Sequence, residues 1–141
     1  SACTSDDPAP SVEVLSATPD RIDPANDLAD DVRIVVAYDD GDGDLGEGIA
    51  QVHDCRAEAL TTELAIPAIA GADMIGSRIT GSMDLYITDV GAAAPATMPS
   101  VCTELGVASL AADQTVFCVV LVDAKQHAGA GDCTEPITLA P

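Results

Sequence analysis

The stretch TVFCVVLV, residues 115–122, decides the fold of this chain. In an extended conformation both of its alternating sets of side chains are apolar, and four of the eight residues are valine. A short apolar run rich in β-branched residues is typical of a central strand that is covered on both faces. We therefore expect a β-sheet core built around these residues.

Six other segments predict strands from their alternation or their β-branched content. The strongest is 32–38, in which Val32, Ile34, Val36 and Tyr38 share one face. We expect at most one short helical turn, with Ser100 as its N-cap. The remaining predicted strands are residues 11–18, 49–57, 60–66, 78–88 and 134–139. About seven strands with almost no helix predict an all-β, antiparallel β-sandwich.

The length of 141 residues fits one domain with a real core. Aromatic residues make up only 2% of the chain against 48% hydrophobic residues, so the core must consist of Val, Ile, Leu and Ala. Residues 1–10 are rich in Ser, Asp and Pro, and we expect a flexible leader or tether there. Residues 11–141 are expected to form the single β-sandwich domain.

The chain is strongly acidic, with a net charge of −19 from 24 acidic and 5 basic residues. Such a charge disfavours binding to nucleic acid or to an anionic membrane surface. The apolar stretches are also far shorter than the roughly 20 residues that a membrane-spanning helix needs.

The five cysteines are spaced unlike any metal-binding or redox motif, since no CxxC occurs. With Cys3 set aside, four cysteines remain and permit three pairings. The pairing we prefer is Cys102–Cys118 together with Cys55–Cys133. An even set of cysteines in such a chain indicates an oxidising compartment, so we expect an extracellular or cell-surface protein stapled by disulfides.

The first three residues, Ser1-Ala2-Cys3, resemble the end of a bacterial lipobox. That resemblance implies a lipid on the sulfur of Cys3, which would be the chain's one attachment to a membrane. The presence of Ser1 and Ala2 counts against it, because lipoprotein processing removes the residues before the cysteine. The alternative is a free or intermolecular Cys3 in a mobile tail.

The chain also resembles the immunoglobulin-like or fibronectin-III-like modules of bacterial surface proteins. The strand pattern carries this resemblance, together with residues 32–38 leading into an acidic loop and residues 115–123 near the C-terminus. It implies an immunoglobulin-like sandwich for residues 11–140. The chain departs from the family in its core signature, because it has no Trp and no Cys in 32–38 to face Cys118.

The run DDGDGD, residues 39–44, places four carboxylates within six residues. Asp40, Asp42 and Asp44 match positions 1, 3 and 5 of a calcium-binding loop, and the glycines let the backbone wrap around an ion. The EF-hand pattern fails further on, where Leu45 stands for Gly and Gln51 for Glu. The rest of a calcium site must therefore come from other loops.

In the expected sandwich the loops 39–48, 67–77 and 123–132 meet at one end, which we call the acidic pole. This convergence predicts a calcium site whose ligands come from more than one loop, with Asp73 or Asp132 as further donors. The alternative is an acidic turn that is simply solvated. The predicted ligands are Asp39, Asp40, Asp42, Asp44 and Asp123.

The sequence His53-Asp54-Cys55 brings together residue types found in active sites, yet alternation along a strand places Asp54 on the opposite face from the other two. No hydrolase, zinc-protease, P-loop or dinucleotide motif is present. We therefore expect no enzyme, but a calcium-stabilised, surface-tethered structural or adhesion module whose partners are other protein chains, copies of itself included. The alternatives are a self-assembling subunit of an extracellular filament, and a ligand-binding or hydrolytic domain that uses the acidic pole.

Overall fold

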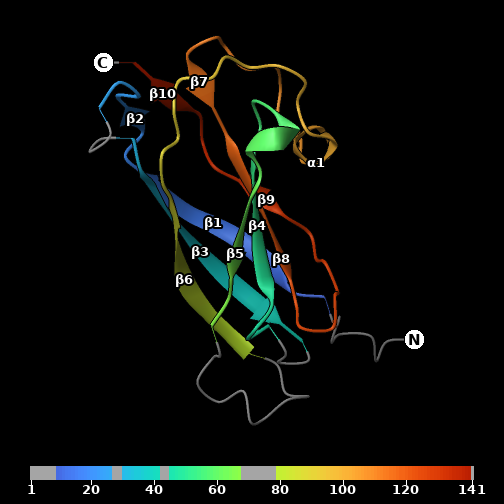
Figure 1. The fold of residues 1–141 in the computed structure, drawn as a ribbon. Helices are drawn as coiled ribbons and strands as arrows, with labels where there is room; N and C mark the ends of the chain where they lie inside the picture. Colours follow the sequence, from blue (N-terminus) through green and yellow to red (C-terminus); the bar gives the residue numbers. More distant parts are fainter. Residues whose placement is uncertain (1–8, 27–29, 42–44, 68–78, 141) are drawn as a thin grey trace.

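The computed structural model describes residues 9–26, 30–41, 45–67 and 79–140 (Figure 1). Within these residues the chain forms ten strands, one 3-10 turn, η1 (Glu58–Leu60), and one short helix, α1 (Ser100–Glu104). No helix in this part of the chain is long and apolar enough to cross a membrane. The expectation of an all-β fold with one short helical turn is confirmed.

The first sheet is antiparallel and has the order β1-β3-β6, from β1 (Ser11–Thr18), β3 (Val32–Asp40) and β6 (Ile79–Ile87). The second has the order β5-β4-β8-β9, from β5 (Thr62–Ala65), β4 (Ile49–Asp54), β8 (Phe117–Val122) and β9 (Asp132–Cys133). In it β8 lies between β4 and β9, as its two apolar faces predicted.

A third, small sheet lies at one end of the molecule (Figure 1). Its central strand is β10 (Ile137–Leu139), which pairs in parallel with β2 (Arg21–Ile22) and antiparallel with β7 (Gln114–Thr115). The described part of the chain thus has three small sheets rather than a clear two-sheet sandwich of seven strands.

The change of pairing partner along residues 115–122 takes place at Val116. The carbonyl of Val116 accepts the backbone N–H of Cys55 at 2.9 Å, one position beyond the last pair of the β4–β8 ladder. Residues 115–122 are therefore not one strand: Thr115 pairs with β10, whereas β8 starts at Phe117 and pairs with β4 and β9. A run that is uniformly apolar gives no sign of such a break.

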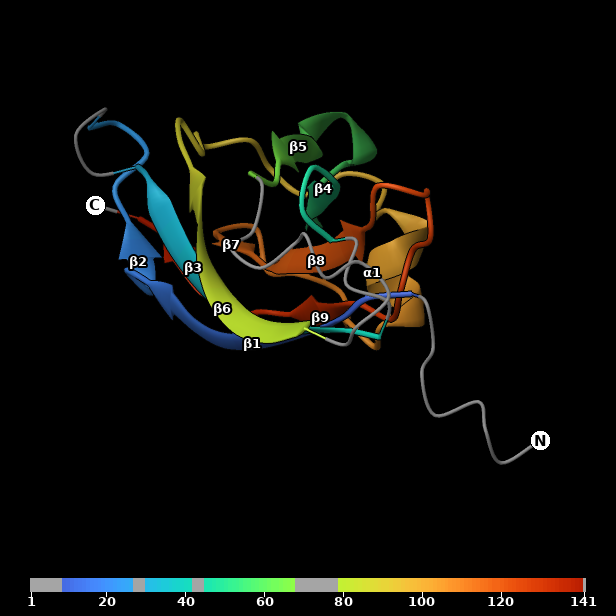
Figure 2. The same cartoon turned by 90° about the horizontal axis from the view of Figure 1, so that it is seen from below.

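The main core lies between the curved sheet β1-β3-β6 and the strands β4 and β8 (Figure 2). Alternation along β3 buries Val32, Ile34 and Val36, each at most 1% exposed. The facing strand β8 contributes Val119 and Leu121, both fully buried. Phe117 is the one aromatic residue in this cluster that is fully buried, so small aliphatic side chains fill the core as the composition predicted.

Candidate functional site

The four cysteines that we expected in disulfides form two bridges, but the pairing we preferred is wrong. The bridges are Cys55–Cys102 and Cys118–Cys133. Cys118 stands directly opposite Cys133 in the β8–β9 pair, with 4.0 Å between the Cα atoms. Because β9 has only two residues and no periodicity, the sequence did not reveal this neighbour.

The second bridge joins β4 to α1. Cys102 is the one buried residue of α1, and its Cα lies 5.9 Å from that of Cys55, which follows β4. The helix begins at its cap Pro99 without a side-chain cap hydrogen bond, so the expected N-cap at Ser100 is wrong. The disulfide and apolar contacts with Val116, rather than a cap, hold this helix in place.

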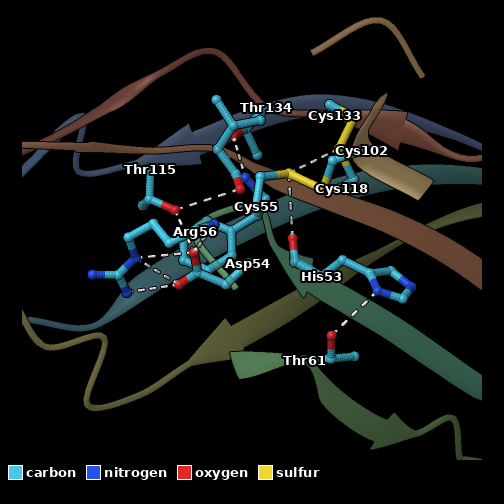
Figure 3. The surroundings of a disulfide bond; sticks show 12 residues. His53, Asp54, Cys55, Arg56, Thr61, Cys102, Thr115, Cys118, Cys133 and Thr134 are labelled. Carbon is cyan, nitrogen blue, oxygen red and sulfur yellow. Dashed lines mark hydrogen bonds and ion pairs between the residues drawn. A yellow bond between two sulfur atoms is a disulfide. The ribbon is translucent and has the colours of Figure 1, made fainter. Parts of the chain in front are cut away.

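The two disulfides touch each other (Figure 3). The Sγ atoms of Cys55 and Cys118, which belong to different bridges, are 3.5 Å apart. Cys55, Cys102 and Cys118 are at most 1% exposed, and their three sulfur atoms lie within 4.8 Å of one another. Cys133 is only half-buried. The four cysteines thus form one cluster in which Cys133 is the single partly exposed residue.

A buried ion pair lies next to this cluster, on the far side of β4 (Figure 3). Asp54 is 3% exposed and Arg56 is fully buried, and they are joined by an Nη2–Oδ2 contact of 2.7 Å. The Asp54 carboxylate also accepts the hydroxyl of Thr115 and the backbone N–H of Arg56. His53 points instead toward Thr61, so the expectation that Asp54 lies on the face opposite His53 is confirmed.

Arg56 uses its guanidinium to hold the chain after β6. Its nitrogen atoms donate to the carbonyls of Val90, Gly91 and Ala93 at 2.8–3.1 Å, while Nε and Nη2 bind Asp54. Its own carbonyl accepts the N–H of Ala96 at 2.8 Å. Arg56 is not among the site residues predicted from the sequence. The signal that could have revealed it is an arginine two positions after an aspartate at a strand end, in a chain with only five basic residues.

The described ends of the three loops at the acidic pole do lie together. Ile66 and the segment 47–48 exchange backbone hydrogen bonds at 2.9 Å. Gly48 is packed so tightly that a Cβ atom there would lie 2.1 Å from the carbonyl oxygen of Val122. The described loop ends therefore lie side by side at one end of β5, β4 and β8 of a single sheet, whereas residues 42–44 and 68–77 of the predicted convergence lie outside the described residues.

The predicted calcium ligands are placed as follows. Asp39 and Asp40 are the last residues of β3, the first half-buried and the second fully buried. Asp42, Asp44 and Asp73 lie outside the described residues. Asp123 is buried next to Gly48, since the backbone carbon of Asp123 is 3.1 Å from the position of a Cβ on that glycine.

The carboxylate of Asp123 organises its own turn. One oxygen accepts the backbone N–H groups of Lys125 and His127 at 2.9 and 2.8 Å, and the other lies 3.0 Å from Nδ1 of His127. Asp132 likewise accepts the N–H groups of Val14 and Cys133, at 2.7 and 2.9 Å. Both of these predicted donors are thus already engaged in holding the backbone.

A second acidic group lies at the opposite end of β3, where we expected none. The carboxylate oxygens of Asp30, Asp31 and Asp89 lie within 4.8 Å of one another. The N–H of Asp89 donates to Asp31 at 3.1 Å, and the N–H of Val90 donates to the carbonyl of Asp30 at 3.0 Å. These contacts join the start of β3 to the end of β6.

The surroundings of His53 displace the pKa of its imidazole. Burial lowers the pKa of His53 from its usual 6.5, and the nearby carboxylates of Glu58 and Glu63 oppose that effect only in part. Its Nδ1 lies 3.3 Å from the hydroxyl of Thr61. The neutral imidazole is therefore the favoured form in the folded protein.

No protein-family model matches this chain, and no curated protein and no solved structure is significantly similar to it.

Proposed function

We propose that this chain is a non-enzymatic extracellular module with a structural or adhesive role. One observation carries the proposal: the buried charged side chains of Asp54, Arg56 and Asp123 are all engaged in holding backbone segments. Buried charged side chains that hydrogen-bond to the backbone make the fold rigid. Groups of a catalytic site instead converge on a cavity with atoms free to bind a ligand. Asp54 does line a depression with Thr61 and Phe117, but both of its carboxylate oxygens are bound by Arg56.

The two disulfides are typical of an oxidising, extracytoplasmic compartment. We extend this to the cell surface, because the strongly negative charge suits an exposed, soluble body and the segment before β1 can serve as a tether. Cys3 would carry the attachment, and it lies outside the described residues. The partners in this proposal are other protein chains.

Protease treatment of intact producing cells tests the location and the tether together. The wild-type protein should be removed from the cell fraction by external protease, whereas a Cys3→Ser variant should appear in the medium. Protection of the wild-type protein in intact cells, with digestion only after lysis, would contradict the proposal.

We also propose that the acidic pole binds calcium through Asp39, Asp40, Asp42 and Asp44. The support is the density of carboxylates in this run and the fixed position of the loop ends around it. Asp123 would support the site by fixing the neighbouring turn, since its carboxylate is engaged there, rather than as a ligand.

Thermal unfolding with added calcium chloride measures this binding. A ligand at 100 times its dissociation constant adds about 2.7 kcal/mol to the free energy of unfolding, so the melting temperature should rise by several degrees. An Asp42→Asn/Asp44→Asn variant is the matched control and should lose the calcium-specific rise. An equal rise with sodium chloride at the same ionic strength would show that the pole is only a solvated acidic turn.

Assembly into a filament remains a second candidate, and one observation favours it. In the sheet order of the described residues β6 lies at an edge, and its Tyr86 is 59% exposed. An edge strand offers backbone groups to a neighbouring copy. Light scattering after size exclusion, with and without calcium, separates the candidates, because monodisperse monomers in both conditions would exclude self-assembly.

A further inference from the structure

The contact between the two disulfides has chemical consequences. A disulfide exchanges when a thiolate attacks one of its sulfurs, and the rate depends on access to that sulfur. Here the Sγ atoms of Cys55 and Cys118 are already 3.5 Å apart. A thiolate formed on Cys118 would therefore be in contact with the other bridge from the moment it appears.

Exposure to solvent differs sharply among the four cysteine residues. Cys55, Cys102 and Cys118 are essentially buried, whereas Cys133 is half-buried. The residue Cys133 also lines two depressions of the surface, one shared with Leu15 of β1 and the other with Leu105 after α1. An external thiol can therefore approach Cys133 from the surface.

We propose that Cys133 is a site of modification by small thiols, and that the two bridges relay the exchange into the core. The external thiolate forms a bond to Sγ of Cys133, and the Cys118–Cys133 bond breaks with its electron pair on Cys118. The Cys118 thiolate then attacks Sγ of Cys55, the Cys55–Cys102 bond breaks, and Cys102 leaves as a thiolate that takes a proton from water. The product has the small thiol on Cys133, a Cys55–Cys118 bridge and a free Cys102, with no net oxidation or reduction.

The charges around Cys133 select the class of thiol. Asp132 precedes Cys133 and its carboxylate binds the Cys133 N–H at 2.9 Å, while Glu135 lines one of the two depressions. The whole chain carries a charge of −19. A cationic thiol is attracted to this surface and an anionic one is repelled.

Peptide mapping by mass spectrometry under non-reducing conditions tests the relay, on a Cys3→Ser protein so that the fifth cysteine does not interfere. The folded protein is treated with cysteamine and then denatured at pH 5 with excess N-ethylmaleimide. The expected products are cysteamine on Cys133, maleimide on Cys102 and a Cys55–Cys118 bridge. Cysteamine on any other cysteine, or maleimide on Cys118 beside an intact Cys55–Cys102 bridge, would overturn the proposal.

Two paired variants sharpen the result. In Cys55→Ser/Cys102→Ser the relay has no second bridge, so maleimide should appear on Cys118 with cysteamine still on Cys133. In Cys118→Ser/Cys133→Ser the remaining bridge is buried and should react at least about tenfold more slowly, because access limits exchange. An equally fast reaction there would show that Cys133 is not the entry point.

The rate of Cys133 modification can be measured on the Cys3→Ser protein, which keeps both disulfides. This measurement tests the proposal even if a paired variant does not fold. At low salt, the rate constant for modification of Cys133, corrected for the fraction of reagent present as thiolate, should be several-fold larger for cysteamine than for the anionic 2-mercaptoethanesulfonate. This ratio should fall toward one in about 0.5 M sodium chloride, where the Debye length is only about 4 Å. The Glu135→Gln change should lower the ratio at low salt. A ratio that changes neither with salt nor with this substitution would refute the proposal that charge selects the thiol.

Discussion

Arg56 binds one carboxylate and three backbone carbonyls from within the core. Removing a guanidinium and a carboxylate from water costs several kcal/mol per ion, and good geometry with additional hydrogen bonds is needed to offset that cost. Here every nitrogen of the guanidinium has an acceptor. The side chain thereby ties the end of β4 to the chain that follows β6.

Replacing Arg56 by Met should therefore destabilise the protein strongly. The change leaves the Asp54 carboxylate buried without its counter-charge, which typically costs about 3–5 kcal/mol. Urea denaturation measures the loss. The matched control is Arg33→Met, which removes an exposed ion pair with Asp84 and should leave the free energy of unfolding nearly unchanged; similar losses in the two variants would contradict this account.

His53 should make the stability depend on pH near neutrality. Because burial lowers its pKa in the folded state below the usual 6.5, the unfolded chain binds the proton first as the pH falls. The free energy of unfolding should therefore fall as the pH drops from 6.5 through the pKa of His53 in the folded protein. The His53→Gln variant should show a smaller fall over the same pH range. An NMR titration of the imidazole should give a midpoint below 6.5, and a midpoint at or above 6.5 would refute the prediction.

At the scale of elements, α1 depends on its disulfide. A five-residue helix is too short to be stable alone, and this one has no side-chain cap. The Cys55–Cys102 bridge and the contacts of Val101 and Leu105 with the sulfur cluster supply what the helix lacks.

Removing each bridge should destabilise the protein by an amount that follows the length of the chain it closes. The separation is 47 residues for Cys55–Cys102 and 15 for Cys118–Cys133. Loop entropy then assigns about 4 kcal/mol to the first bridge and about 3 kcal/mol to the second. Denaturation of the two Cys→Ala pairs should show this order, and the reverse order would mean that contacts of the folded state dominate.

The long strands could be predicted from the sequence, whereas the short ones could not. Strand β3 alternates from Val32 to Tyr38, and β1 alternates up to its irregularity between Val14 and Ser16, so their hydrophobic faces can be recognised in the sequence without a partner. Strands β2, β7 and β9 have two residues each, and they are defined only by their hydrogen bonds to a neighbouring strand. The disulfide pairing depends on β9, and for that reason it was beyond the reach of sequence patterns.

For the whole molecule, the charge of −19 is spread over a small body and opposes compaction. Monovalent salt should therefore raise the melting temperature between 10 mM and 0.5 M sodium chloride, because the Debye length falls from about 30 Å to a few Å. Scanning calorimetry measures the rise. A variant with exposed Asp20, Asp113 and Glu104 changed to their amides should respond less, and a melting temperature that is independent of salt would contradict the argument.

The candidate sites could be predicted only in part. The acidic run and the meeting of three loop ends followed from the sequence, because both depend on long strands and on local composition. The hydrogen bonds between the Asp123 carboxylate and the backbone of its own turn could not be predicted. An aspartate that caps a turn and one that binds an ion have the same local sequence.

The placement of the first and last strands determines how the protein would carry a pulling force. The start of β1 and the strand β10 lie at opposite ends of the molecule in both views (Figures 1 and 2). A load applied between Pro10 and Ala140 thus runs roughly along β1, which is paired antiparallel with β3 from Ser11 to Thr18. From β1 the load passes along the chain into β2 and then across the parallel β2–β10 pair, whose hydrogen bonds are strained together, in shear, rather than one after another. A module tethered through its leading segment would in this way carry the pull of its tether along paired strands rather than across them.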